Sequence, residues 1–445
     1  MTSILIQGAF TVNEEQIIQS DVRITNGKIE EIKKNLTLRE GETCIDARGK
    51  YLLPGLIDDQ VHFREPGLTH KACIRTESRA AVAGGITSFI EMPNTNPQTT
   101  TQEKLDEKFQ IAKENSLANY SFMFGGTNDN LAEIQKLDPK QVAGLKLFLG
   151  SSTGNMLVDD ETVLRNIFSS TKLVIAAHCE DEPTVKANLQ AHIDEYGEDI
   201  PIEKHPVIRS HEACYKSSSK AIALAKETGA RLHVFHLSTA EELSLFRNDI
   251  PLAEKKITSE VCVHHLWFSD KDYASKGTQI KWNPAVKTDA DRTALWDALN
   301  DDRIDVLATD HAPHTLEEKS QVYTKAPSGG PLVQHALLAL LTAHKEGKIS
   351  LEKIVQKACH NPAILFQISK RGYLREGYFA DLVLVDLNSE TTVKKEDLLY
   401  QCGWSPFEGT TFGAKVLQTW VNGQTVYAND QIIENKAALQ LTFDR

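Results

Sequence analysis

Apolar runs of strand length alternate with amphipathic stretches through most of the chain, and this pattern predicts the fold. From Leu53 onward there are eight such runs, separated by segments with helical spacing of their hydrophobic residues. Strands that alternate with helices are typical of parallel sheets, and eight such units close a barrel. The runs cover residues 56–63, 87–92, 120–124, 145–149, 173–178, 232–237, 257–266 and 305–309. We therefore predict an α/β protein with a (β/α)8 TIM-type barrel over residues 53–371.

Both ends of the chain show short strands and turns instead. The stretch 1–9 is alternately apolar, and short strand-like runs cover residues 4–6, 21–25, 28–32 and 44–46. Asn26 and Gly27 are a strong hairpin signal between the second and third of these runs. Strand-like runs resume over residues 380–385, 416–421 and 424–427. We predict that residues 1–52 and 372–445 together form a small β-sandwich module beside the barrel.

Composition narrows the class of protein. In 445 residues, 41% hydrophobic and 25% charged, no apolar run approaches the roughly 20 residues of a membrane span. The first residues lack a basic leader, so we expect a cytoplasmic protein. A net charge of -12 argues against nucleic acid and anionic membranes as partners. Seven scattered cysteines, an odd number, argue against a disulfide framework or a thiolate zinc site. We also expect a homodimer, because closed two-fold dimers are the commonest assemblies of identical soluble chains.

The first predicted barrel strand is unusually polar. Residues 54–67 read Pro-Gly-Leu-Ile-Asp-Asp-Gln-Val-His-Phe-Arg-Glu-Pro-Gly. Alternate residues of a strand share a face, so Asp58, Gln60, His62 and Arg64 are expected to point one way. Such a row is either a satisfied polar cluster at the barrel rim or part of a metal site, and the strand alone does not decide between them.

Four other predicted strands end in residues that can bind metal. Lys146 lies in an almost wholly apolar strand, where a free ammonium is costly to bury. It needs either a salt bridge or a lowered pKa, and a neutral lysine amine can react with carbon dioxide to form a carbamate. His178, His236 and Asp310 close three further runs. A single histidine there is more often structural, but the carboxyl ends of barrel strands converge on one mouth. Nitrogen and oxygen ligands without thiolates suit Zn²⁺, with Mn²⁺ as an alternative.

With these residues in place, the sequence resembles the amidohydrolase superfamily, and within it the dihydroorotases. The resemblance covers essentially the whole chain and includes the strand-one motif. The other matching segments, in order, are residues 92–97, 144–148, 178–180, 283–284, 310–314 and 405–409. It implies the reversible interconversion of N-carbamoyl-L-aspartate and L-dihydroorotate, the ring-closing step of pyrimidine synthesis.

The resemblance also implies roles for individual residues. One or two Zn²⁺ ions would be held, with carboxylated Lys146 as the bridge, by His62, Lys146, His178, His236 and Asp310. Asp310 would also act as general base and acid. The substrate carboxylate would be bound by Arg64, Asn94 and His314, and the ring would lie against Asn283, Ser328 and Gly329. An arginine fork suits a carboxylate in an acidic protein.

One position departs from the family pattern. Most relatives carry histidine where this chain has Gln60, and an amide oxygen is a poorer ligand than imidazole. Gln60 could bind the metal through its oxygen, hydrogen-bond a water, or mark a decayed site. Two alternatives remain. One is a hydantoinase, dihydropyrimidinase or allantoinase, which uses the same metal chemistry on other cyclic amides. The other is a non-catalytic scaffold, which the departure at Gln60 permits. We expect four further histidines to be structural: His233, His264, His265 and His311.

Overall fold

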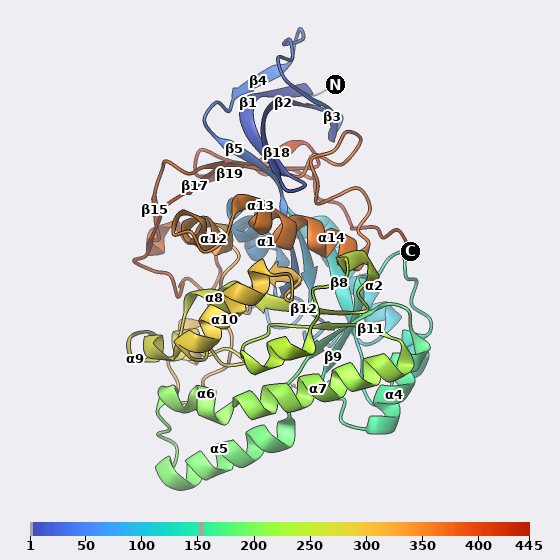
Figure 1. Cartoon of the computed structure of the whole chain (residues 1–445), viewed down its shortest axis with the longest axis vertical. Coiled ribbons are helices and arrows are strands. Elements are labelled where there is room, and N and C mark those ends of the chain that lie inside the picture. The colour runs from blue at the N-terminus through green and yellow to red at the C-terminus, as the bar shows by residue number, and fades with distance from the viewer. Residues whose placement is uncertain (1–2, 151–154) are drawn as a thin grey trace.

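The chain forms a barrel with a separate β-sheet at one end (Figure 1), as seen in a computed structural model that describes residues 3–150 and 155–445. Residues 1–2, at the start of the first predicted stretch, lie outside the described residues. Within the described residues, no helix is both long and apolar enough to cross a lipid bilayer.

Eight strands, all paired in parallel and in sequence order, form the barrel sheet. The two outer strands are joined by a parallel bridge between Val61 and His311, and the His62 amide donates to the His311 carbonyl at 2.7 Å. The predicted barrel is therefore confirmed. Its strands are β6 (Leu56–Val61), β7 (Ile86–Glu91), β8 (Asn119–Gly125), β9 (Gly144–Phe148), β10 (Val174–His178), β11 (Arg231–Val234), β12 (Ile257–Cys262) and β13 (Val306–Ala308).

The seventh strand is shorter than predicted. It ends at Cys262, and residues 263–267 turn into the short helix α8 (Val263–Trp267). His264 stacks on Trp282, with ring centroids 4.3 Å apart, and His265 lies 4.0 Å from His264. The prediction that the seventh strand run extends through these two histidines to residue 266 was wrong, because they lie on a helix.

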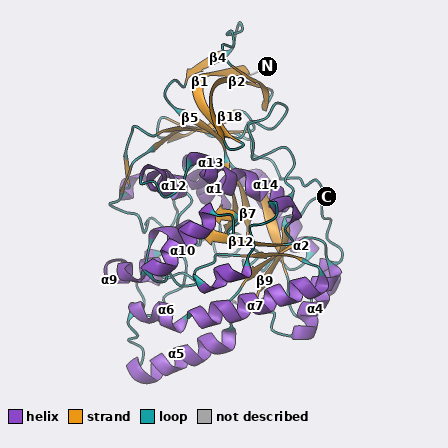
Figure 2. Cartoon of the chain, viewed as in Figure 1, coloured by secondary structure: helices purple, strands orange, loops and turns teal. Residues whose placement is uncertain are grey.

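Helices surround the barrel strands (Figure 2). The longest, α7, begins where Ser210 Oγ accepts a hydrogen bond from the Ala213 amide and ends at Gly229, whose left-handed backbone closes the helix. The helices are α1 (Ile74–Ala83), α2 (Gln102–Asn115), α3 (Leu131–Ile134), α4 (Glu161–Ser170), α5 (Glu182–Tyr196), α6 (His205–Ile208), α7 (His211–Thr228), α9 (Tyr273–Lys276), α10 (Asp289–Asn300), α11 (Leu316–Lys319), α12 (Ala336–Lys345), α13 (Leu351–Val355) and α14 (Asn361–Phe366), together with α8.

Segments from both ends of the chain meet in one mixed nine-stranded sheet, as the terminal β module requires. The strands are β1 (Ser3–Asn13), β2 (Gln16–Thr25), β3 (Lys28–Lys33), β4 (Thr43–Asp46), β5 (Tyr51–Pro54), β14 (Leu382–Asp386), β17 (Lys415–Val421), β18 (Gln424–Ala428) and β19 (Gln431–Ile432). The N-terminal and C-terminal parts join where β5 pairs with β14. The last residues return to the barrel, where Gln440 bridges to Tyr120 and Phe443 to Ile368. A separate two-stranded ribbon is formed by β15 (Thr391–Thr392) and β16 (Thr411–Phe412).

Candidate active site

A cavity of about 710 Å³ opens where the barrel strands end. Active sites of barrel enzymes lie at this end, because the loops after the strands meet there. All twelve residues predicted for the site line this one cavity: Gln60, His62, Arg64, Asn94, Lys146, His178, His236, Asn283, Asp310, His314, Ser328 and Gly329. They come from strands and loops that are far apart in the sequence, and the fold brings their side chains together around one cavity.

The first strand does not alternate regularly. Its pairing with β7 shifts register between Asp58 and Val61, which changes the faces on which the following side chains lie. Gln60 and His62 reach the cavity, but Asp58 does not, since its carboxylate accepts hydrogen bonds from the Thr309 amide (3.2 Å) and hydroxyl (2.6 Å). The prediction that Asp58 shares the face of Gln60 and His62 was therefore wrong.

His62 is held between two other site residues. Its Nδ1 lies 2.8 Å from the Asn94 side-chain oxygen, and its Nε2 lies 3.2 Å from Asp310 Oδ1. An amide oxygen only accepts, so Nδ1 carries the hydrogen and Nε2 presents its lone pair beside Asp310. Asn94 thus orients His62 in this structure through its oxygen, which leaves only its amide NH₂ to face a substrate.

His178 and His236 form a second pair. Their rings meet edge to face, with Nδ1 of His178 3.0 Å from Nε2 of His236. His178 Nε2 lies 2.9 Å from the Glu180 carboxylate, which fixes a hydrogen on that nitrogen. Burial lowers the pKa of both histidines, so both are neutral near pH 7. The two imidazole nitrogens therefore share a hydrogen bond in this structure, and both rings are neutral, as ligands of a cation would be.

Lys146 is almost completely buried on β9. Its Nζ lies 4.1 Å from the ring centre of Phe235 and 4.8 Å from that of Phe148. Among the described residues it makes no ion pair within 4.0 Å. Burial lowers the pKa of Lys146 to about 8, although Asp310 acts in the opposite direction. A substantial fraction of the amine is therefore neutral at physiological pH.

Asp310 follows the last barrel strand. Burial raises the pKa of Asp310 to about 7, and Lys146 opposes the rise. Its backbone is left-handed, with φ of 48°, as are those of His236 (40°) and Arg64 (67°). Such backbones cost about 1 kcal/mol or more in residues other than glycine, and they tend to cluster at functional sites.

Basic groups gather in one part of the cavity lining. Arg64 donates from Nε to the Pro313 carbonyl at 3.0 Å, and its Nη2 lies 3.0 Å from His314 Nε2. Lys71 Nζ lies 3.0 Å from His314 Nδ1 and also lines the cavity. Lys71 was not predicted to be a site residue. Its position soon after the strand-one motif, in a protein that is acidic overall, was the only sign in the sequence that it could bind an anion. Together these groups can bind a small anion.

The loop that follows His314 closes one wall. Gly329 has φ of 126°, and a Cβ there would lie 2.4 Å from the Ala312 carbonyl oxygen, so the loop needs glycine at this position. The Asn283 side-chain oxygen is buried without a hydrogen-bond partner among the described residues. A buried unpaired acceptor beside a cavity is suited to a donor on a ligand.

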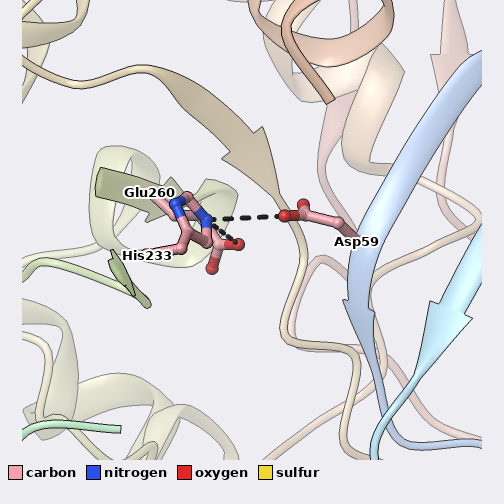
Figure 3. A group of neighbouring side chains, drawn as sticks. All are labelled: Asp59, His233 and Glu260. Atoms are coloured by element: carbon pink, nitrogen blue, oxygen red, sulfur yellow. Dashed lines mark ion pairs between the residues drawn. The ribbon is translucent and has the colours of Figure 1, made fainter. Parts of the chain in front are cut away.

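A different trio brings three ligand atoms closest together. Among the described residues, the one group of three histidine, cysteine or acidic side chains whose ligand atoms lie within 4.8 Å of one another is Asp59, His233 and Glu260 (Figure 3). None of them lines the cavity. His233 was predicted to be purely structural. The predicted ligands instead form two pairs, His62 with Asp310 and His178 with His236.

Comparisons with known proteins place these features in context. The sequence pattern described as "Amidohydrolase family" matches residues 51–426. A dihydroorotase from Halobacterium salinarum is 35% identical over 416 residues, which cover 93% of this chain and 94% of that protein. A dihydroorotase from Ligilactobacillus salivarius is 34% identical, with 96% and 99% covered.

Solved structures give a second set of relatives. An L-hydantoinase (dihydropyrimidinase) from Arthrobacter aurescens superposes with a TM-score of 0.94 at 27% identity, covering 99% of this chain and 100% of that one. A dihydropyrimidinase from Brevibacillus agri has a TM-score of 0.88 at 24% identity and covers 100% of both chains. At that lower identity the similarity supports the fold alone.

Proposed function

Because the chain belongs to the amidohydrolase family, we propose that it is a metal-dependent dihydroorotase, which interconverts N-carbamoyl-L-aspartate and L-dihydroorotate. The observation that carries this proposal is the convergence of all twelve predicted site residues on one cavity at the carboxyl ends of the barrel strands. The reaction is the ring-closing step of pyrimidine synthesis. The expectations of a cytoplasmic location, a homodimer and no nucleic-acid or membrane partner remain predictions.

The residues present fit a divalent cation. His178 and His236 direct nitrogens at each other across 3.0 Å, and the other ring nitrogen of His236, Nδ1, is buried without a hydrogen-bond partner. One or two Zn²⁺ ions would be held by His62, Lys146, His178, His236 and Asp310. An ion bound there supplies Lewis acidity toward water and toward the ring carbonyl. Gln60 offers only an amide oxygen, so one of two positions would bind more weakly.

Lys146 would enter this set as a carbamate. Its neutral amine would attack carbon dioxide, a nitrogen–carbon bond would form and one proton would leave, so that the buried amine would become a carbamate with one negative charge shared by two oxygens. The absence of an ion pair to Lys146 among the described residues within 4.0 Å and its position between two aromatic rings support this, because a buried ammonium without a carboxylate is costly.

The remaining residues would bind the substrate and move its protons. Arg64 and His314 would hold the ring carboxylate, with the Asn94 amide and the Ser328–Gly329 loop against the ring. Asp310 would take a proton from the attacking water and deliver it to the ring nitrogen as the amide bond breaks. Ring closure follows the same path in reverse, with the amide nitrogen giving its proton back to Asp310.

The related cyclic amidases are the second candidate class, because the similar structure from Arthrobacter aurescens is an L-hydantoinase (dihydropyrimidinase). The Arg64 and His314 cluster favours a substrate that carries a carboxylate, which hydantoin and allantoin lack. Initial rates with L-dihydroorotate, hydantoin and allantoin, measured on one preparation, decide between these substrates. Faster turnover of hydantoin or allantoin would contradict the dihydroorotase assignment.

The metal requirement is tested on the same preparation. We expect dialysis against a chelator to abolish turnover and added Zn²⁺ to restore it, with elemental analysis reporting the metal content at each stage. The Asp310→Asn variant should lose turnover by at least about a thousandfold while keeping its fold, since the proton carrier is removed. Full activity in the metal-free protein would exclude a metal-dependent mechanism.

A further inference from the structure

Three ionisable side chains meet inside the barrel, apart from the cavity. Asp59 comes from β6, His233 from β11 and Glu260 from β12 (Figure 3), and all three are fully buried. Asp59 directly precedes Gln60, and His233 lies three residues before His236. Because the strands are parallel, the trio lies farther toward their amino-terminal ends than the cavity residues do.

The spacing of the trio is that of ligands around an ion. His233 Nε2 is 3.5 Å from Asp59 Oδ2 and 3.5 Å from Glu260 Oε2. These separations exceed a hydrogen bond. Ligands at about 2.1 Å from a tetrahedral Zn²⁺ are about 3.4 Å apart, close to the separations observed. Both Asp59 oxygens, Glu260 Oε2 and His233 Nε2 are buried with no hydrogen-bond partner among the described residues.

The neighbours of His233 prepare it to bind a cation. The Thr258 hydroxyl donates to the Leu232 carbonyl at 3.3 Å and lies 2.8 Å from His233 Nδ1. Since the Thr258 hydrogen is used, its oxygen accepts from Nδ1, and Nε2 is directed at the two carboxylates. Burial lowers the pKa of His233, but Asp59 and Glu260 outweigh it and raise that pKa to about 9, so a metal ion bound at Nε2 would replace a proton. Metal-binding histidines are oriented in this way by an acceptor behind the ring.

Glu260 is held in place from the other side. Its Oε1 accepts from the His236 amide at 3.3 Å and from the Cys262 thiol at 3.5 Å. These contacts orient Oε2 toward His233. They also connect the trio to the backbone of His236, whose side chain belongs to the active site.

We propose that Asp59, His233 and Glu260 form a second metal site, which binds one divalent transition-metal ion, with Zn²⁺ the best match to one nitrogen and two carboxylate oxygens. The ion neutralises two buried carboxylates that otherwise share one imidazole. Its role is structural, since it braces β6, β11 and β12 behind His236. The site is separate from the ligands of the proposed dihydroorotase reaction and does not depend on that assignment.

The alternative to a metal ion between these three side chains is a proton on His233 Nε2. It would place one imidazolium between two carboxylates, but its N–H would be 3.5 Å from either oxygen and would form no good hydrogen bond. A proton gives no anomalous X-ray signal and does not change the metal content, so the two occupants are distinguished by experiment.

The first experiment uses the wild-type protein crystallised with Zn²⁺. Diffraction data collected above and below the zinc absorption edge should give an anomalous peak between Asp59, His233 and Glu260, separate from any peak in the cavity. Absence of that peak overturns the proposal. A failure of the dihydroorotase assignment would appear in the substrate assays and would leave this result unaffected.

The second experiment measures zinc retained per chain after dialysis against a chelator-buffered Zn²⁺ solution. Asp59→Asn should retain one zinc fewer than wild type. Asp58→Asn is the matched control, since the neighbouring buried carboxylate is already bound by Thr309, and it should retain the wild-type amount. Circular dichroism checks the fold, and Glu260→Gln replaces Asp59→Asn if that variant does not fold. Unchanged zinc content in the folded variant overturns the proposal.

Discussion

Single residues in this protein often serve both the fold and the site. Arg64 shows this most clearly, because two of its nitrogens are used by Pro313 and His314 and its guanidinium still lines the cavity. A side chain anchored in this way loses little freedom when it binds a carboxylate, which favours binding. Replacing Arg64 should therefore weaken substrate binding more than removing one surface charge would.

Arg64→Ala should raise the Michaelis constant for L-dihydroorotate at least tenfold, equivalent to about 1.4 kcal/mol, because a charged hydrogen-bonding partner of the carboxylate is lost. Arg64→Lys should recover only part of this loss, since lysine keeps the charge but cannot make the same two contacts. Steady-state kinetics on both variants measure the effect. An unchanged Michaelis constant in Arg64→Ala would show that the carboxylate binds elsewhere.

Glu42 gives a residue-scale prediction for pH. Burial acts to raise its pKa, but the Arg23 guanidinium, 2.9 Å away, outweighs it and lowers the pKa of Glu42 to about 2. A carboxyl with a depressed pKa stabilises the fold fully above its ordinary pKa of 4.5 and loses this contribution as the pH falls toward 2. Glu42→Gln should therefore lower the free energy of unfolding by about 1–3 kcal/mol at pH 7 and by clearly less at pH 3.

Urea unfolding of both proteins at the two pH values measures this difference. Glu30→Gln is a suitable control, because Glu30 lies on the exposed side of the same sheet and pairs with the exposed Arg39. An equal effect of Glu42→Gln at pH 7 and pH 3 would show that its charge does not contribute.

Elements whose hydrophobic pattern is simple were predictable from the sequence. All eight barrel strands appear where apolar runs predicted them, since parallel strands are buried on both faces. The predictions fail where an interaction between distant elements decides the local geometry. The register shift in β6 depends on its pairing with β7, and it moves Asp58 to Thr309 and Asp59 to His233.

The site was predictable to a similar extent. Residue types at strand ends and the family resemblance identified the twelve predicted site residues that line the cavity. Neither could give the contacts that these side chains make with one another. The pairing of His62 with Asn94, the presence of Lys71 and the Asp59 trio all depend on side-chain positions across strands. Strand periodicity carries no information on such contacts.

The loop after α11 gives an element-scale prediction. Lys319 is fully buried and donates to the carbonyls of Lys281 (3.2 Å), Pro327 (2.9 Å) and Gly329 (2.8 Å). Lys319→Met should release the loop that lines the cavity, because three buried carbonyl groups lose their donor. We expect the Michaelis constant for L-dihydroorotate to rise at least fivefold, with a smaller change in kcat.

The control is Lys325→Met, since Lys325 lies in the same segment but is largely exposed, and among the described residues its ammonium makes only a 3.7 Å ion pair with Glu198. It should behave as wild type in the same assay. If Lys319→Met also leaves the Michaelis constant unchanged, the loop does not contact the substrate.

At the scale of the whole molecule, the largest hydrophobic cluster of the barrel extends into the terminal sheet, which also has a smaller buried cluster of its own around Ile6, Val22 and Trp420. Val12 and Leu53 of the sheet belong to the same buried cluster as Val82 and Leu337 of the barrel helices. The sheet also covers the end of the molecule opposite α5 and α7 (Figure 1). The shared cluster couples the sheet to the barrel, so we expect both to unfold in one transition.

Asp381 tests this coupling, because it links the two parts through polar contacts. Its carboxylate is paired with buried Arg371, and it accepts from the Asn422 amide (2.8 Å) and from the side chain of Asn119 on β8 (3.2 Å). Asp381→Ala leaves a buried guanidinium without its carboxylate, which costs about 3–5 kcal/mol. We expect calorimetry to show a single transition in both proteins, at a lower Tm in the variant. Asp386→Ala should change the Tm far less, because it loses the half-buried pair with Lys50 and local hydrogen bonds from Asn388 and Ser389, but no polar contact with the described part of the barrel. Two separate transitions in Asp381→Ala would mean that the sheet and the barrel are independent folding units. In that case the substitution would destabilise one unit and leave the other to unfold at its own temperature.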